Sequence, residues 1–182
     1  MKYTHITVNG SVPFDYDLKT PSRMGDVIAS GICNKNVKFK YAVTNNELEL
    51  QNMINYPHYK ETMLLTNKSL FKKYLFFDNV NFLPKFSELP GINEDFEKLS
   101  NQTLAVLLAS WSDNDVVLLF GCDIEDLNER AKLIKIMESN PTVKYKFCRK
   151  PNVNKIKLFD HLHNVEVMNY PEVKEYAKVD RK

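Results

Sequence analysis

Apolar positions along this chain recur with two periods, an alternation typical of strands and a wider spacing typical of helices. Alternating or short apolar runs predict strands at residues 3–8, 36–43, 62–66, 115–122, 142–148 and 165–168. Helical spacing predicts helices at residues 22–32, 47–54, 69–77, 93–112, 124–139, 154–162 and 171–178. Strands interleaved with helices in this way predict an α/β fold with a doubly wound, mostly parallel Rossmann-like sheet, a three-layer sandwich.

The most apolar stretch predicts the centre of this sheet. Residues Val116 to Gly121 are apolar without interruption, which is typical of a parallel strand covered on both faces. The helix before it, broken near Ser100, is apolar nearly all round in its second part and is therefore expected to be buried. Residues 78–92 are rich in turn residues and predict a surface excursion docked by Phe82, Leu83 and Phe86.

Length and composition narrow the class of protein. A chain of 182 residues, with 43% hydrophobic and 26% charged residues, is typical of a single globular domain spanning residues 1–182. The three cysteines follow neither a zinc-binding nor a disulfide spacing, and no apolar run reaches membrane-spanning length. We therefore expect a protein of the cytoplasm that does not bind membranes.

Charge is distributed unevenly. Residues 131–182 hold 12 Lys and Arg against 6 Asp and Glu, whereas the whole chain carries a net charge of only +2. A basic C-terminal third can attract phosphate or an acidic partner, or it can be a solvated surface. Within it, Lys144 to Lys157 interleaves basic residues with Tyr145 and Phe147, as single-strand nucleic-acid binders do. Alternation places both rings opposite the lysines, which favours core packing over nucleic-acid binding.

Candidate ligand-binding residues stand where the predicted strands end. In open α/β sheets, ligands bind beyond the carboxyl ends of the strands, near the point where the strand order reverses. The residues at these ends are mostly polar and would lie along one edge of the sheet. They are Asn9, Gly10, Ser11, Asn45, Asn67, Gly121, Asp123, Arg149 and Lys150.

Two of these candidates have structural alternatives. The backbone N–H groups of residues 9–11 can hold an anionic oxygen, or these residues can form an ordinary turn that ends a strand. The Asp123 carboxylate can accept hydrogen bonds from ribose or sugar hydroxyls or help to hold a metal ion. Alternatively, it caps a helix that begins at Ile124 or Glu125. The sequence alone leaves both alternatives open.

No complete catalytic or metal-binding motif is present. His161 and His163 lack a carboxylate or thiolate at zinc-binding spacing. The segment His5-Ile6-Thr7 is half of the paired H-x-T signature of two-histidine phosphoesterases, but the second half is missing. A G-x-S-x-G nucleophile turn is also missing. The sequence therefore assigns no catalytic residue, no metal ligand and no certain cofactor.

Several short segments together resemble a known family. The first strand ends in N-G-S and is followed by an acidic, aromatic loop (9–17). An apolar helix then leads into VVLLFGCD (116–123). A Glu-Arg pair (129–130) and NVEVMNYP (164–171) come after it. This order resembles Rossmann-like proteins related to bacterial sialyltransferases, many of them phage-carried and uncharacterised. Their first turn, usually G-N-G-P-S, faces the nucleotide of a sugar donor. Here Val8 replaces the first glycine, and the proline is absent.

Two functions from different classes follow. The resemblance implies a nucleotide or nucleotide-sugar ligand and a glycosyltransferase-type reaction, in the host cytoplasm if the protein is phage-encoded. Residues 9–11 would then contact phosphate or base, Asp123 hydroxyls, and Arg149 or Lys150 phosphate. The alternative is a non-catalytic structural or interaction protein, such as a phage accessory or inhibitor protein, that binds a protein partner or forms a homo-oligomer. The aromatic segments around Phe14 and Phe76, and only five glycines, favour this alternative.

Overall fold

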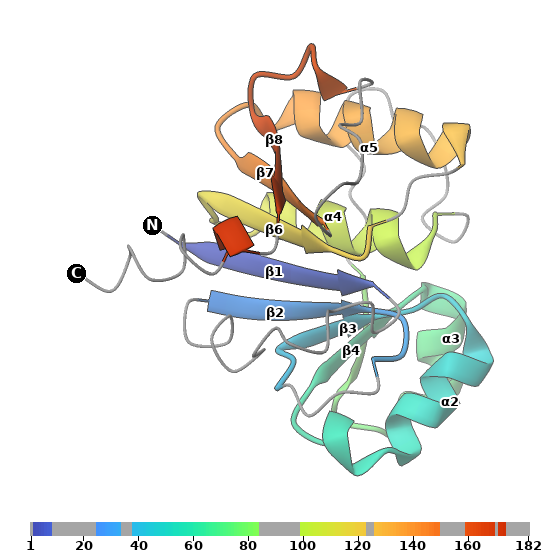
Figure 1. Cartoon of the computed structure of the whole chain (residues 1–182). Coiled ribbons are helices and arrows are strands. Elements are labelled where there is room, and N and C mark those ends of the chain that lie inside the picture. Colours follow the sequence, from blue (N-terminus) through green and yellow to red (C-terminus); the bar gives the residue numbers. More distant parts are fainter. Residues whose placement is uncertain are drawn as a thin grey trace.

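The strands of this protein form one parallel sheet. The computed structural model describes residues 2–8, 25–33, 38–83, 99–122, 126–149, 159–169 and 171–173. Eight strands pair in the order β5-β4-β3-β2-β1-β6-β7-β8, and every neighbouring pair is parallel (Figure 1). The prediction of a doubly wound, Rossmann-like α/β fold is confirmed.

The first half of the chain builds one side of the sheet. Its strands are β1 (Tyr3–Val8), β2 (Gly25–Ser30), β3 (Tyr41–Val43), β4 (Met63–Thr66) and β5 (Val80–Phe82). Between them lie α2 (Glu47–Asn55), the 3-10 helix η1 (Pro57–Tyr59) and α3 (Lys68–Lys73). Asn46 caps α2 and Asn67 caps α3, because each side-chain oxygen accepts a hydrogen bond from a backbone N–H of the first turn.

The second half builds the other side. Its elements are α4 (Asn101–Trp111), β6 (Val116–Phe120), α5 (Leu127–Ser139), β7 (Lys144–Arg149) and β8 (Val165–Asn169). Ser100 caps α4, so this helix begins at Asn101, where the sequence predicts a break; residues 93–98, the first part of the predicted helix, lie outside the described residues. Every residue of β6 is buried, as the uninterrupted apolar run predicts.

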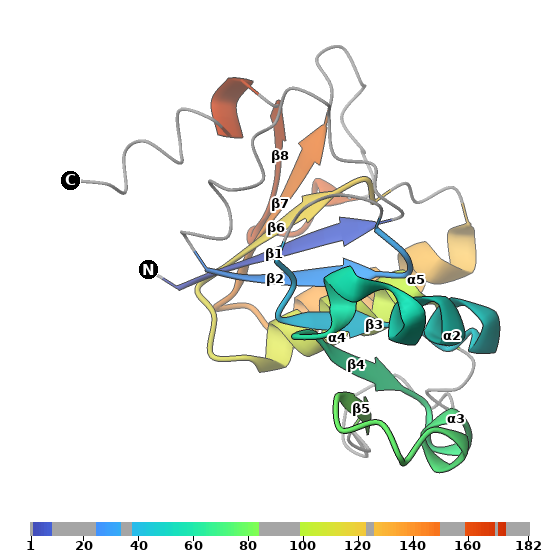
Figure 2. The ribbon, with the colours of Figure 1, turned by 90° about the horizontal axis from the view of Figure 1, so that it is seen from below.

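Apolar side chains are buried on both faces of the sheet. On one face, α4 and α5 pack against residues such as Ile6 of β1 and Leu119 of β6. On the other face, Leu50 of α2 and Leu70 of α3 pack over β2, β3 and β4. Figure 2 shows the strands as one twisted sheet, with α2 and α3 beside its β3–β5 side. The predicted three-layer arrangement is therefore present.

The predicted helix over residues 22–32 is wrong, because residues 25–30 form strand β2. The apolar residues Val27, Ile28 and Ile32 do have helical spacing, but a short apolar run fits a buried strand equally well. Pairing on both sides, with β1 and β3, decides in favour of the strand. Gly31, which the helical interpretation placed at a helix end, instead follows the strand with a φ of 73°.

Other boundaries also differ from the predictions. Strand β5 lies inside the segment 78–92, which the sequence predicts as a surface excursion only, because three residues are too few for a periodic signal. Strand β3 is shorter than the predicted 36–43, and α3 ends at Lys73 rather than Phe77. Residues 159–162 lie outside any α-helix, and of the predicted terminal helix only 171–173 are described, in helical conformation.

Candidate functional site

The strand order reverses at β1, which defines the switch point of the sheet. The chain proceeds from β1 through β2 to β5 on one side, and from β6 to β8 on the other. Thr7 pairs with Ala29 of β2 and with Phe120 of β6, so the three strands end next to one another. In doubly wound sheets this carboxyl edge is where ligands bind.

Glycines with left-handed backbone conformation stand on both sides of β1 at this edge. Gly31 directly follows β2 with a φ of 73°, and Gly121 directly follows β6 with a φ of 68°. A residue with a Cβ atom adopts this conformation at a cost, and glycine also lets another group approach the backbone closely. Gly121 was a candidate from the sequence. Gly31 was missed, because its neighbours were assigned to a helix.

The structure brings together the strand ends that carry most of the candidate residues. Residues 9–11 directly follow Val8, but they lie outside the described residues, as do Asp123 and Lys150. The backbone of Arg149 ends β7, one position beyond the pair formed by Phe120 and Cys148. The candidates therefore follow β1, β6 and β7, which are consecutive in the sheet.

Asn45 and Asn67 follow strands further from the switch point. Strand β3 lies two strands from β1 and β4 lies three, so these residues are about 10 and 14 Å from β1 at the usual strand spacing. The Asn45 side chain donates to the carbonyl of Leu99 at 3.2 Å, and its backbone N–H donates to Asn101 Oδ1 at 2.9 Å. Asn67 caps α3. Both residues thus hold the starts of helices.

Asp126, rather than Asp123, caps the helix after β6. Its side chain accepts hydrogen bonds from the backbone N–H groups of Asn128 at 2.7 Å and Glu129 at 3.2 Å. Helix α5 therefore begins at Leu127, and the prediction that it begins at Ile124 or Glu125 is wrong. Since Asp126 is the cap of α5, the alternative that Asp123 caps this helix is removed, and a ligand-binding role remains the prediction for Asp123.

A carboxylate from α5 occupies the N-terminus of α4 on the same edge. The hydroxyls of Ser100 and Thr103 both donate to Glu129, and Lys132 Nζ lies 3.0 Å from the same carboxylate. Burial by itself raises the pKa of Glu129, but these hydrogen bonds and the lysine charge outweigh it, so the pKa lies below its ordinary value. Residues 29 positions apart are joined here, which no local sequence pattern indicates.

Glu129→Gln is expected to destabilise the protein by about 2 kcal/mol near neutral pH, because it removes charge-assisted hydrogen bonds. A carboxylate whose pKa is lowered on folding stabilises the folded state above its unfolded pKa, and this contribution is lost as the pH falls through the folded pKa. The difference in melting temperature between wild type and variant should therefore shrink from about pH 7 to about pH 3. Glu138→Gln, a half-exposed position on the same helix, is the control. A pH-independent difference would contradict the assigned role.

The basic segment from Lys144 onwards packs as the alternation predicts. Tyr145 and Phe147 are buried, so their rings are unavailable for stacking on bases. Tyr145 donates from its hydroxyl to Ser110 Oγ at 2.7 Å. Alternation places Lys146 opposite the two rings, yet it is buried as well, and it pairs at 2.8 Å with Glu166, its register partner on β8. Both rings of the described part of this segment therefore belong to the core, as the sequence predicts.

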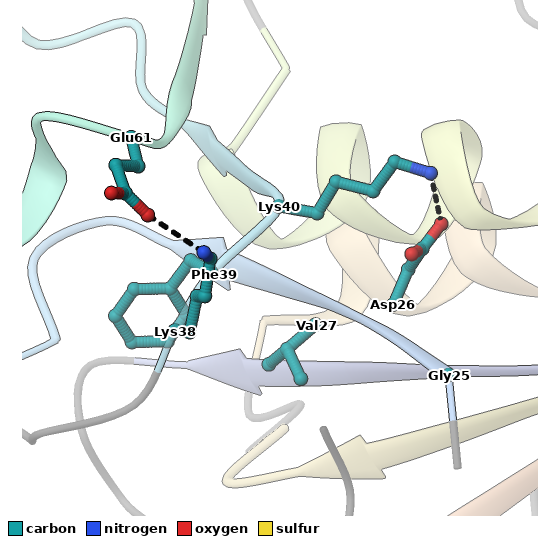
Figure 3. Close-up of a pocket in the computed structure, with 7 residues that line it drawn as sticks. All are labelled: Gly25, Asp26, Val27, Lys38, Phe39, Lys40 and Glu61. Carbon is teal, nitrogen blue, oxygen red and sulfur yellow. Dashed lines mark hydrogen bonds and ion pairs between the residues drawn. The ribbon is translucent and has the colours of Figure 1, made fainter. Parts of the chain in front are cut away.

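A pocket of about 370 Å³ opens at the opposite, amino edge of the sheet (Figure 3). Its charged residues are already paired: Lys38 with Glu61 and Lys40 with Asp26, each at 2.6 Å. Phe39 and Val27 form its apolar wall. The pocket holds balanced charges and lies away from the switch point, so it differs from the candidate site in both position and electrostatics.

Thiol catalysis at Cys148 and metal binding are two further kinds of chemistry that the described residues can be checked for. Burial raises the pKa of the Cys148 thiol, which makes it a poor nucleophile. Across the ranges that the structure describes, no group of three or more His, Cys, Asp or Glu is placed to hold a metal ion. In the same part of the chain, none of the helices has the length and apolar character needed to cross a membrane.

The fold and the position of the site define a doubly wound, Rossmann-like α/β protein with a candidate ligand site at its β1/β6 switch point. In comparisons with known proteins, no family model, curated protein or solved structure matches the chain.

Proposed function

We propose that this protein binds a nucleotide or nucleotide-sugar at the carboxyl edge of its sheet. The observation that carries the proposal is the strand order, which places the reversal at β1, between β2 and β6. Ligands of sheets with this topology bind in the crevice outside such a reversal. The glycines after both neighbouring strands support it, because they allow a ligand to approach the backbone.

The chemistry of the candidate residues suits a phosphorylated sugar ligand. Residues 9–11 would supply backbone N–H groups to phosphate or base, and Asp123 would accept hydrogen bonds from hydroxyls. Arg149 or Lys150 would neutralise phosphate charge from the end of β7. Binding is the function proposed. Glycosyl transfer is the reaction class that the family resemblance adds, and an assay with a labelled sugar donor would test it separately.

A thermal-shift screen against nucleoside diphosphates, nucleoside monophosphates and their sugar conjugates tests the proposal. A ligand at about 100 times its dissociation constant stabilises by about 2.7 kcal/mol, which raises the melting temperature of a chain of this size by roughly 5–10 °C. At least one compound should produce such a shift. No shift by any of them at millimolar concentration would overturn the proposal.

Asp123→Asn separates ligand binding from stability. An amide accepts more weakly and carries no charge, so the variant should lose about tenfold or more in affinity for the compound found in the screen, with an unchanged melting temperature. Asp126→Asn, three positions further along, is the matched control. Asn caps helices about as well as Asp, so this variant should keep both stability and affinity. Equal affinity of Asp123→Asn and wild type would remove Asp123 from the site.

A further inference from the structure

Exposed apolar side chains gather at the β5 edge of the sheet. Three of them lie in the turn that follows α3, and the fourth lies at the end of β5. Figure 2 shows α3 and β5 next to each other at this edge of the sheet. Phe76 is 90% exposed, which is costly for a side chain of this size unless something else covers it. We call this set the aromatic patch; its members are Leu75, Phe76, Phe77 and Phe82.

Two rings of the patch pack against partly buried rings of the same region. Phe82 packs against Phe71 with ring centroids 5.1 Å apart, and Phe77 packs against Tyr74 at 6.3 Å. Tyr74 is itself fixed, because its hydroxyl accepts from Gln51 Nε2 at 2.7 Å and donates to Glu47 Oε1 at 3.2 Å. A surface whose rings are already ordered loses little side-chain entropy when a partner binds.

The patch is not built for pairing through the strand edge. The backbone N–H of Val80 donates to the carbonyl of Phe77 at 3.0 Å, and that of Phe82 donates to Asn81 Oδ1 at 2.8 Å. An added strand would need such N–H groups free. A partner must therefore dock on the side chains rather than extend the sheet.

Positive charge borders the patch. Lys68, Lys72 and Lys73 belong to α3, and Lys73 pairs with Glu47 at 2.9 Å. Lys68 and Lys72 are exposed, and neither forms an ion pair with any residue that the structure describes. Asp78, which directly follows Phe77, is exposed as well, so Lys68 and Lys72 leave this end of the molecule with a net positive charge, which opposes the association of two copies through the patch. The charges instead complement an acidic partner.

We infer that the aromatic patch is a docking surface for another protein, through a segment that combines an apolar anchor with neighbouring Asp or Glu. The anchor would cover Phe76 and its neighbours, since aromatic side chains dominate the energetics of interfaces. The carboxylates would pair with Lys68 and Lys72 at the rim, where charge governs partner choice and association rate. This surface is separate from the proposed nucleotide site and does not depend on it.

Selection from a random peptide library, with wild type and a Phe76→Ser, Phe82→Ser double variant as targets, tests the inference. Wild type should enrich peptides that carry Asp or Glu beside Phe, Leu or Trp, and the double variant should bind them about tenfold or more weakly. A Lys68→Glu, Lys72→Glu variant should also bind them weakly, and salt should weaken wild-type binding. Leu127→Ser, which changes an exposed leucine on α5, should bind like wild type.

Several outcomes would overturn the inference. Enriched peptides without acidic residues, or equal binding to the double variant, would contradict it directly. Dimerisation of wild type that the double variant loses, with no peptide enriched, would assign the patch to a second copy. Co-sedimentation with phosphatidylserine vesicles, again with no peptide enriched, would assign it to a membrane surface. A melting temperature lowered by several degrees in Phe76→Ser would show that the chain itself covers the patch, whereas we expect no change. Nucleotide-induced shifts should be the same in all these variants.

Discussion

Leu118→Asp is expected to leave no folded protein. Leu118 lies in the middle of β6, is 1% exposed, and packs with Tyr3, Phe120 and Val173. An aspartate there would be a buried carboxylate without a partner, which costs several kcal/mol, while the loss of leucine packing adds about 2–5 kcal/mol. A typical domain has a total stability of only about 5–15 kcal/mol.

Circular dichroism and thermal unfolding measure this effect. The variant should be insoluble or show no cooperative transition, and Leu118→Ala should melt at a lower temperature than wild type. The control is Leu127→Asp at the first position of α5, where leucine is 71% exposed. An acidic residue there favours the helix dipole, so this variant should melt like wild type. A cooperative, unshifted transition for Leu118→Asp would refute the central position of β6.

The central strand could be predicted because several local signals agree. The apolar run from Val116 to Phe120 is too short for a typical helix, begins with two β-branched valines, and lies between a polar turn ending at Asp115 and a glycine at position 121. The start of α4 was also readable, since the predicted break near Ser100 coincides with the residue that caps this helix. Element type therefore followed from sequence wherever one pattern excluded the others.

The sequence failed where two patterns overlap or where the segment is too short. The apolar residues of β2 fit a helix and a strand equally, and only pairing with β1 and β3 distinguishes the two. The three residues of β5 are too few to show a period. At the start of α5, both Asp123 and Asp126 are suitable caps by type, and hydrogen-bond geometry assigns the role to Asp126.

The candidate site was predictable only to the level of strand ends. The rule that ligands bind at carboxyl ends selects every strand equally, and it therefore included Asn45 and Asn67. Which ends meet depends on the strand order, a long-range property that places β6 beside β1. The same limit applies to Gly31, whose importance appears only once β2 is known to be a neighbour of β1.

Gly25→Ala is expected to destabilise the protein by about 3 kcal/mol, at the upper end of ordinary overpacking. Gly25 begins β2 opposite Tyr3 of β1. A Cβ atom built on Gly25 would lie 1.9 Å from the Tyr3 carbonyl oxygen and 2.7 Å from its carbonyl carbon. These are backbone atoms, so the clash cannot be relieved by rotating a side chain, and the first pair of the β1–β2 ladder has to separate.

Thermal unfolding should show the Gly25→Ala variant melting roughly 6–12 °C below wild type, the shift that such a loss produces in a chain of this length. Asp26→Ala, one residue further along β2, is the matched control. Its side chain is 43% exposed, and its interaction within the described part of the chain is the surface ion pair with Lys40, so its removal should cost about 1 kcal/mol or less. Both substitutions lie at the amino end of β2. A lower melting temperature in Gly25→Ala alone would therefore show that the close backbone contact at Gly25 sets the spacing between β1 and β2. Equal melting of Gly25→Ala and wild type would contradict the close approach of Tyr3 to Gly25, and with it the register of β1 and β2.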